Sequence, residues 1–86
     1  MSEMNVNTNT TANNRILALV NPDYMKRIPF FIKKHATGKT CELIAREFPD
    51  IYEVFSKSEE PDEDAKNQMS KIVNDIFKER MAKHNL

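Results

Sequence analysis

The sequence has little of several residue types on which disulfide-linked, metal-binding and catalytic proteins depend. It holds one cysteine, one glycine, two histidines and no tryptophan among 86 residues. A lone cysteine cannot form an internal disulfide, and a structural zinc site normally takes four Cys or His ligands arranged in close pairs. We therefore expect no disulfide, no metal and no cofactor.

Long apolar runs and an excess of one charge are also missing. The densest apolar run, residues 28–32, is far shorter than the roughly 20 residues that span a bilayer. No basic start followed by an apolar stretch marks a secretory signal. Thirteen basic residues balance thirteen acidic ones, so no global field draws the molecule to nucleic acid or anionic lipid. We expect a cytoplasmic protein without a membrane segment.

Catalytic motifs are present only as fragments. Gly38-Lys39-Thr40 matches the end of a phosphate-binding loop, but Lys33 stands where that loop needs its first glycine. Cys41 would need a base to act as a nucleophile, and His35, six residues away, belongs to no recognised motif with it. We expect Cys41 to be a small core residue. We name no catalytic residue and predict that the protein is not an enzyme.

The sequence does contain helical periodicity. The clearest pattern is an apolar stripe at spacings of one, three and four residues near the C-terminus, formed by Met69, Ile72, Val73, Ile76, Phe77 and Met81. We predict that this stripe lies in the core or mediates self-association. Apolar and polar residues nowhere alternate as a strand requires. The fold class is therefore all-α, a small bundle of about four to five short helices with one long amphipathic C-terminal helix.

Proline, glycine and capping residues predict the helix boundaries. Pro22 and Pro61 are placed to begin helices, and Pro29 to interrupt one. Gly38 is the natural helix end, and Thr40 the cap of the next helix.

The N-terminal segment differs in composition from the rest of the chain. Residues 1–14 are rich in Asn and Thr and have little to bury, which predicts a flexible arm. We predict that residues 15–86 form a single helical domain, because a chain of this size has room for only one core.

Charge is distributed in blocks. Residues 15–46 hold seven Lys or Arg and two acids, residues 47–64 hold one and eight, and residues 65–86 hold five and two. The blocks can attract one another within the fold, or the first can form a binding patch for phosphates or an acidic protein face. The candidate patch residues are Tyr24, Lys26, Arg27, Lys33, Lys34, His35 and Lys39. Phe30 and Phe31 stand among these cations and could join them in binding, but aromatic residues at this spacing more often belong to the core.

Residues 40–56 resemble the first helix and turn of a helix-turn-helix DNA-binding unit. Ala45 matches the small residue where the two helices cross, whereas Pro49 stands in the usual place of glycine. Asp50 and Glu53 fall where a recognition helix would face phosphate. The resemblance implies a nucleic-acid-binding regulator, and the other reading is a packing corner between helices.

Two functional hypotheses follow. The first is a non-enzymatic small helical binding protein, an adaptor or inhibitor that acts through a macromolecular partner, with a protein favoured over nucleic acid and with homo-oligomers expected. We interpret its small size and its Asn, Lys, Ile and Met content as those of a phage or mobile-element accessory protein. The alternative is the nucleic-acid-binding regulator with the helix-turn-helix-like segment at 40–56.

Overall fold

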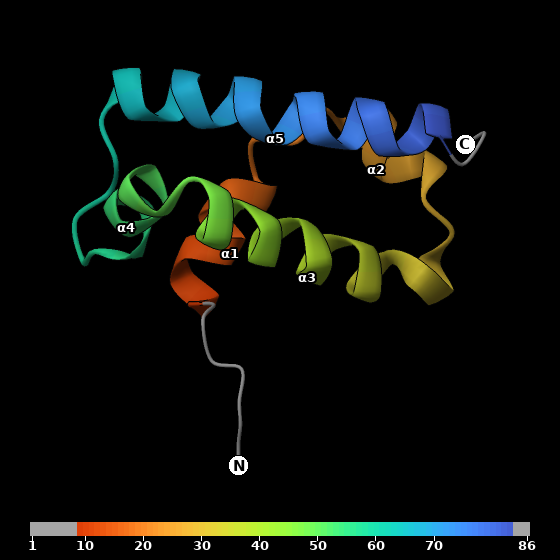
Figure 1. Cartoon of the computed structure of the whole chain (residues 1–86), viewed down its shortest axis with the longest axis horizontal. Helices are drawn as coiled ribbons and strands as arrows, with labels where there is room; N and C mark the ends of the chain where they lie inside the picture. Colours follow the sequence, from red (N-terminus) through yellow and green to blue (C-terminus); the bar gives the residue numbers. More distant parts are fainter. Residues whose placement is uncertain (1–8, 84–86) are drawn as a thin grey trace, which may run out of the picture.

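A computed structural model describes residues 9–83 of the chain as five α-helices without a strand. They are α1 (Thr10–Leu17), α2 (Pro22–Arg27), α3 (Phe30–Glu47), α4 (Pro49–Ser56) and α5 (Glu63–Lys83). The two long helices, α3 and α5, run in opposite directions (Figure 1), and α1 and α4 lie at the end where α5 begins. The predicted all-α bundle with one long C-terminal helix is confirmed. None of these helices combines the length and the apolar character needed to cross a membrane.

Helix α1 begins earlier than the sequence predicted. The Asn9 side chain accepts a hydrogen bond from the Ala12 backbone N–H at 3.0 Å and thereby caps the helix. Ala12 is fully buried, so this first turn already contributes to the core. Residues 10–14, predicted to belong to the arm, are thus helical, and Ala12 among them is buried. Residues 1–8 lie outside the described residues.

Pro22 and Pro29 lie at helix boundaries, as predicted. Pro22 occupies the first turn of α2, and Asn21 caps that helix by accepting from the Asp23 N–H at 2.9 Å. Pro29 separates α2 from α3, because its ring cannot continue the preceding helix. Pro61 lies just before α5, whose first turn is capped instead by the Asp62 carboxylate, which accepts from Ala65 N–H.

Gly38 does not end a helix, and that prediction was wrong. Helix α3 is 18 residues long and runs through Gly38 without a break. Thr40, predicted as a cap, lies inside the helix, where its hydroxyl donates to the Ala36 carbonyl at 2.9 Å and is buried. A single glycine costs a helix only about 1 kcal/mol relative to alanine, and packing of the buried face of α3 outweighs that cost. The fragmentary phosphate-loop motif is thus ordinary helix.

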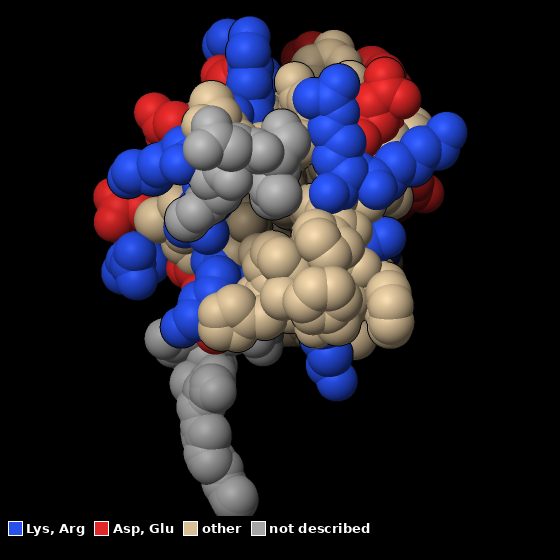
Figure 2. Space-filling model, turned by 90° about the vertical axis from the view of Figure 1, so that its right-hand side faces the viewer, with Lys and Arg blue, Asp and Glu red and all other residues tan. Residues whose placement is uncertain are grey.

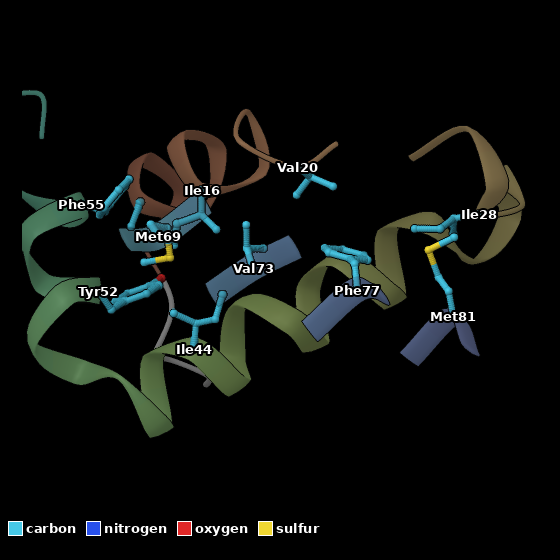
Figure 3. Packing of buried hydrophobic residues seen from close by; sticks show 11 residues of the cluster. Ile16, Val20, Ile28, Ile44, Tyr52, Phe55, Met69, Val73, Phe77 and Met81 are labelled. Atoms are coloured by element: carbon cyan, nitrogen blue, oxygen red, sulfur yellow. The ribbon is translucent and has the colours of Figure 1, made fainter. Parts of the chain in front are cut away.

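The core lies where α5 crosses the other helices (Figure 3). From α5 it takes Met69, Val73, Phe77 and Met81, each at most 5% exposed, while Ile72 and Ile76 are half-buried against it. The remaining core side chains come from α1, α3, α4 and the connections on either side of α2: Ala12, Ile16, Val20, Ile28, Ile44, Tyr52 and Phe55. The C-terminal stripe therefore faces its own bundle.

Candidate binding surfaces

Three consecutive apolar side chains are exposed at the start of α3. Phe30 is 87% exposed, Phe31 is 75% exposed and Ile32 is 38% exposed. The two phenylalanine rings contact each other edge to face, with centroids 5.9 Å apart. We call these three residues the aromatic patch. It belongs to the end of the bundle seen in Figure 2, where a broad uncharged surface is bordered by Lys and Arg side chains.

The exposure of the aromatic patch follows from where α3 begins. Pro29 is the N-cap of α3, and Figure 1 shows α1 and α4 toward the opposite end of this helix. Phe30 lies two turns before Thr37 and hence on a similar side of the helix, yet Thr37 is buried. The expectation that Phe30 and Phe31 face the core was therefore wrong. Successive helical residues point about 100° apart, so three in a row could not all have faced one core.

An apolar groove lies beside the aromatic patch. It has a volume of about 450 Å³ and runs between the first half of α3 and the last turns of α5. Its apolar lining consists of Ile28, Ile32, Ala36, Phe77 and Met81, and its polar lining of His35, Lys39, Thr40 and Arg80. Ile32 thus belongs to both features, which makes the patch and the groove one continuous apolar surface.

Basic side chains surround this surface. Of the predicted binding residues, Lys26, Arg27, Lys34, His35 and Lys39 are exposed, and Lys33 is half-buried. Tyr24 does not join them as an exposed ring, because it packs partly buried against the core. Lys39 and Arg80 line the groove, the exposed Arg27 directly precedes the groove residue Ile28, and the exposed Lys34 lies one helical turn after Phe30. We call these four residues the basic rim. Within residues 9–83, Lys39 is the one rim residue with a carboxylate at ion-pair distance, Glu42 at 3.8 Å.

Sequence reasoning considered Phe30 and Phe31 beside the cations but favoured the core for them, and it missed Ile32 and Arg80 as site residues. The available signal was Pro29 immediately before three apolar residues. Pro29 places a helix start there, and three successive residues of a helix point in different directions, so at least one of them must be exposed. Arg80 could not be found in this way, since only the pairing of α5 with α3 brings it to the groove.

A second groove, of opposite charge, lies between α4 and the start of α5. Its volume is about 630 Å³, and Ile51, Val54, Pro61 and Ala65 line its apolar part. Carboxylates line the rest, namely Asp50, Glu59, Glu60, Asp62 and Asp64, beside Lys57 and Gln68. A 2.9 Å hydrogen bond from Lys66 lowers the pKa of Glu60 and favours its charged form. We call this feature the acidic groove.

The groups considered for catalysis are not assembled. Cys41 is fully buried in α3, and its burial raises the pKa of the thiol to about 11, so the nucleophilic thiolate is disfavoured at neutral pH. His35 lies on the exposed surface of the same helix. Across residues 9–83, His, Cys, Asp and Glu side chains form no group of three that could hold a metal ion.

The helix-turn-helix-like segment becomes a corner between α3 and α4. Helix α4 would be the recognition helix, but Tyr52 and Phe55 face the core. Its exposed side chains include Asp50 and Glu53, whose charges repel phosphate. The apolar side of α4 therefore packs into the bundle at this corner.

The two surfaces lie at opposite ends of the bundle. The aromatic patch is at the start of α3, and the acidic groove is where α4 meets α5 (Figure 1).

No protein-family model, curated protein or solved structure matches the chain. Function is therefore argued from these surfaces alone.

Proposed function

We propose that this is a non-enzymatic binding protein whose aromatic patch and adjoining apolar groove take an acidic, apolar surface of a protein partner. The observation that carries the proposal is the exposure of Phe30 and Phe31, at 87% and 75%, inside a border of cations. Soluble domains rarely leave large contiguous apolar side chains in water without a partner to cover them.

The energies involved are sufficient for specific binding. Transferring a phenylalanine side chain from water to an apolar contact contributes about 1.5–3 kcal/mol, and exposed aromatic anchors commonly carry most of an interface's affinity. The basic rim adds little net affinity per charge, but it selects an acidic face and speeds encounter. A partner surface with leucine or aromatic side chains between carboxylates meets both requirements.

A protein is favoured over nucleic acid because the cations border an apolar groove. A phosphate backbone would leave Ile28, Ile32 and Met81 in the groove uncovered. The eight acids of residues 47–64 would in addition oppose non-specific attraction to DNA or RNA. Base stacking on Phe30 and Phe31 is the form that nucleic-acid binding would take, and the experiment below tests it.

The setting we propose is the cytoplasm, with the protein acting as an adaptor or inhibitor of the accessory kind found in phages and mobile elements. One cysteine allows no internal disulfide, which suits a reducing compartment. Uncovered phenylalanines also favour homo-oligomers, because a second copy can bury them.

Fluorescence anisotropy with labelled probes tests the proposed function. The probes are a synthetic peptide of Glu, Leu and Phe, the same peptide with Lys in place of Glu, single-stranded oligo-dT and a DNA duplex. We expect the acidic peptide to bind, the basic peptide not to bind, and Arg27→Glu with Lys34→Glu to abolish binding. The control, Arg46→Glu with Lys71→Glu, changes net charge equally at exposed sites outside the patch and its groove.

The nucleic-acid probes decide between the two classes of partner. If oligo-dT or duplex binds more tightly than the acidic peptide, and each lost cation lowers the slope of log affinity against log salt by about one, the nucleic-acid alternative is correct. If neither peptide nor nucleic acid binds the folded wild type, the proposed function is wrong.

A further inference from the structure

We propose that the acidic surface taken by the aromatic patch is the acidic groove of a second copy of this chain. The inference rests on the proposed function of the patch and names its partner. The protein would then associate head to tail, with the start of α3 of one copy seated between α4 and α5 of the next.

The two surfaces are complementary in charge. Lys39 and Arg80 of the basic rim line the apolar groove, and Arg27 and Lys34 are exposed near it. The acidic groove is lined by five carboxylates and one lysine, and one of these carboxylates, Glu60, is paired with Lys66. Opposite charges on the two faces favour this pairing, whereas patch-to-patch pairing would bring like charges together. Zero net charge means that two whole molecules do not repel each other as they approach.

The two surfaces also match in apolar character. Phe30 and Phe31 project from a helix start. Ile51, Val54, Pro61 and Ala65 give the acidic groove an apolar lining, and Val54 is 36% exposed. The volume of about 630 Å³ is large enough to receive aromatic side chains. Each surface therefore offers the other both an apolar contact and a charged border.

The positions of the surfaces determine the kind of assembly. An interface between two different surfaces is heterologous, so each copy keeps one free patch or groove for a further copy. Patch and groove lie at opposite ends of α3 and α5 (Figure 1), and repeated pairing along that direction extends a chain instead of closing a dimer. We expect the mean mass to rise continuously with protein concentration and to fall with added salt.

Two full-length variants test the pairing by complementation. The patch variant carries Phe30→Ser and Phe31→Ser, and the groove variant carries Asp62→Lys and Val54→Lys. All four positions are exposed, and helical circular dichroism with a thermal melt verifies that both variants fold. Because Asp62 also caps α5, Asp64→Lys with Val54→Lys serves as a second groove variant that keeps the cap.

Sedimentation equilibrium of the variants gives the result. Each variant alone should be monomeric, and an equimolar mixture should form a species of twice the monomer mass and stop there, because one intact patch and one intact groove remain. A groove variant that still dimerises alone would overturn the inference in favour of patch-to-patch pairing. A wild type that stays monomeric at high micromolar concentration and low salt would also overturn it.

The failure of this inference is distinguishable from failure of the proposed function. A monomeric wild type that binds the acidic peptide through Arg27 and Lys34 would refute self-association alone. A wild type that neither associates nor binds the peptide would refute both.

Discussion

The Tyr52 hydroxyl on α4 donates a hydrogen bond to the Asn13 side-chain oxygen on α1 at 2.7 Å, and it accepts one from the Asn9 backbone N–H at 2.8 Å. The tyrosine thereby holds the first turn of α1 against the bundle. This contact explains why residues 10–14, predicted to belong to an arm, are part of the packed domain.

Removing this hydroxyl should destabilise the protein. Tyr52→Phe leaves the Asn9 N–H and the Asn13 carbonyl without their partner in a partly buried site, and we expect the free energy of unfolding to fall by about 1–3 kcal/mol. Urea unfolding followed by circular dichroism measures the change. Tyr24→Phe is the control and should change stability by less than about 0.5 kcal/mol. Equal stability of the two variants would show that the hydroxyl bonds contribute nothing.

Gly38→Ala should stabilise the protein. Helix α3 passes through Gly38, and an added Cβ would meet no atom within 4 Å. Alanine lowers the entropy of the unfolded chain and favours helix, so we expect a gain of about 0.5–1 kcal/mol in the free energy of unfolding and a higher melting temperature. A loss of stability would mean that α3 is broken at this residue.

Core truncations along the C-terminal stripe should differ according to burial. Phe77 is 2% exposed, and Phe77→Ala should cost about 3–5 kcal/mol, enough to unfold many small domains. Ile76 is only half-buried, so Ile76→Ala should cost distinctly less. Chemical denaturation of the two variants supplies the comparison. The reverse order would place Ile76 rather than Phe77 against the other helices.

Stability should decrease at alkaline pH because of Cys41. Its thiol ordinarily titrates near 9.0, and burial raises the pKa to about 11 in the folded chain. Between these values the unfolded chain loses the proton first, so the folded state binds more protons and the free energy of unfolding falls as pH rises. Burial of Tyr52 raises its pKa too and adds to the decrease.

Urea titrations across this pH window, with Cys41→Ala beside the wild type, measure the effect. The variant should show a shallower loss of stability, and the wild-type thiol should react with alkylating reagent at neutral pH only after unfolding. Identical pH dependence of the two proteins would contradict the burial of this thiol.

The sequence predicted features that depend on neighbouring residues. Helical periodicity located the long C-terminal helix, and Pro29 separated α2 from α3, because a missing N–H acts locally. Gly38 was misjudged because its local preference is weak, and contacts along α3 outweigh it. Which side chains of α3 stay exposed depends on how the helices pack against one another in three dimensions. For this reason most basic residues of the candidate site were predicted, whereas the core was favoured for Phe30 and Phe31.

We propose that the exposed aromatic side chains at the start of α3 form the binding surface. The most direct test compares Phe31→Ser with Phe48→Ser, since Phe48 is a second exposed phenylalanine, 41% accessible, at the other end of the same helix. Both proteins are first shown to fold, and their affinity for the labelled acidic peptide is then measured by anisotropy. We predict that Phe31→Ser lowers the affinity by about tenfold or more, while Phe48→Ser leaves it unchanged. Equal affinities for the wild type and Phe31→Ser would contradict it.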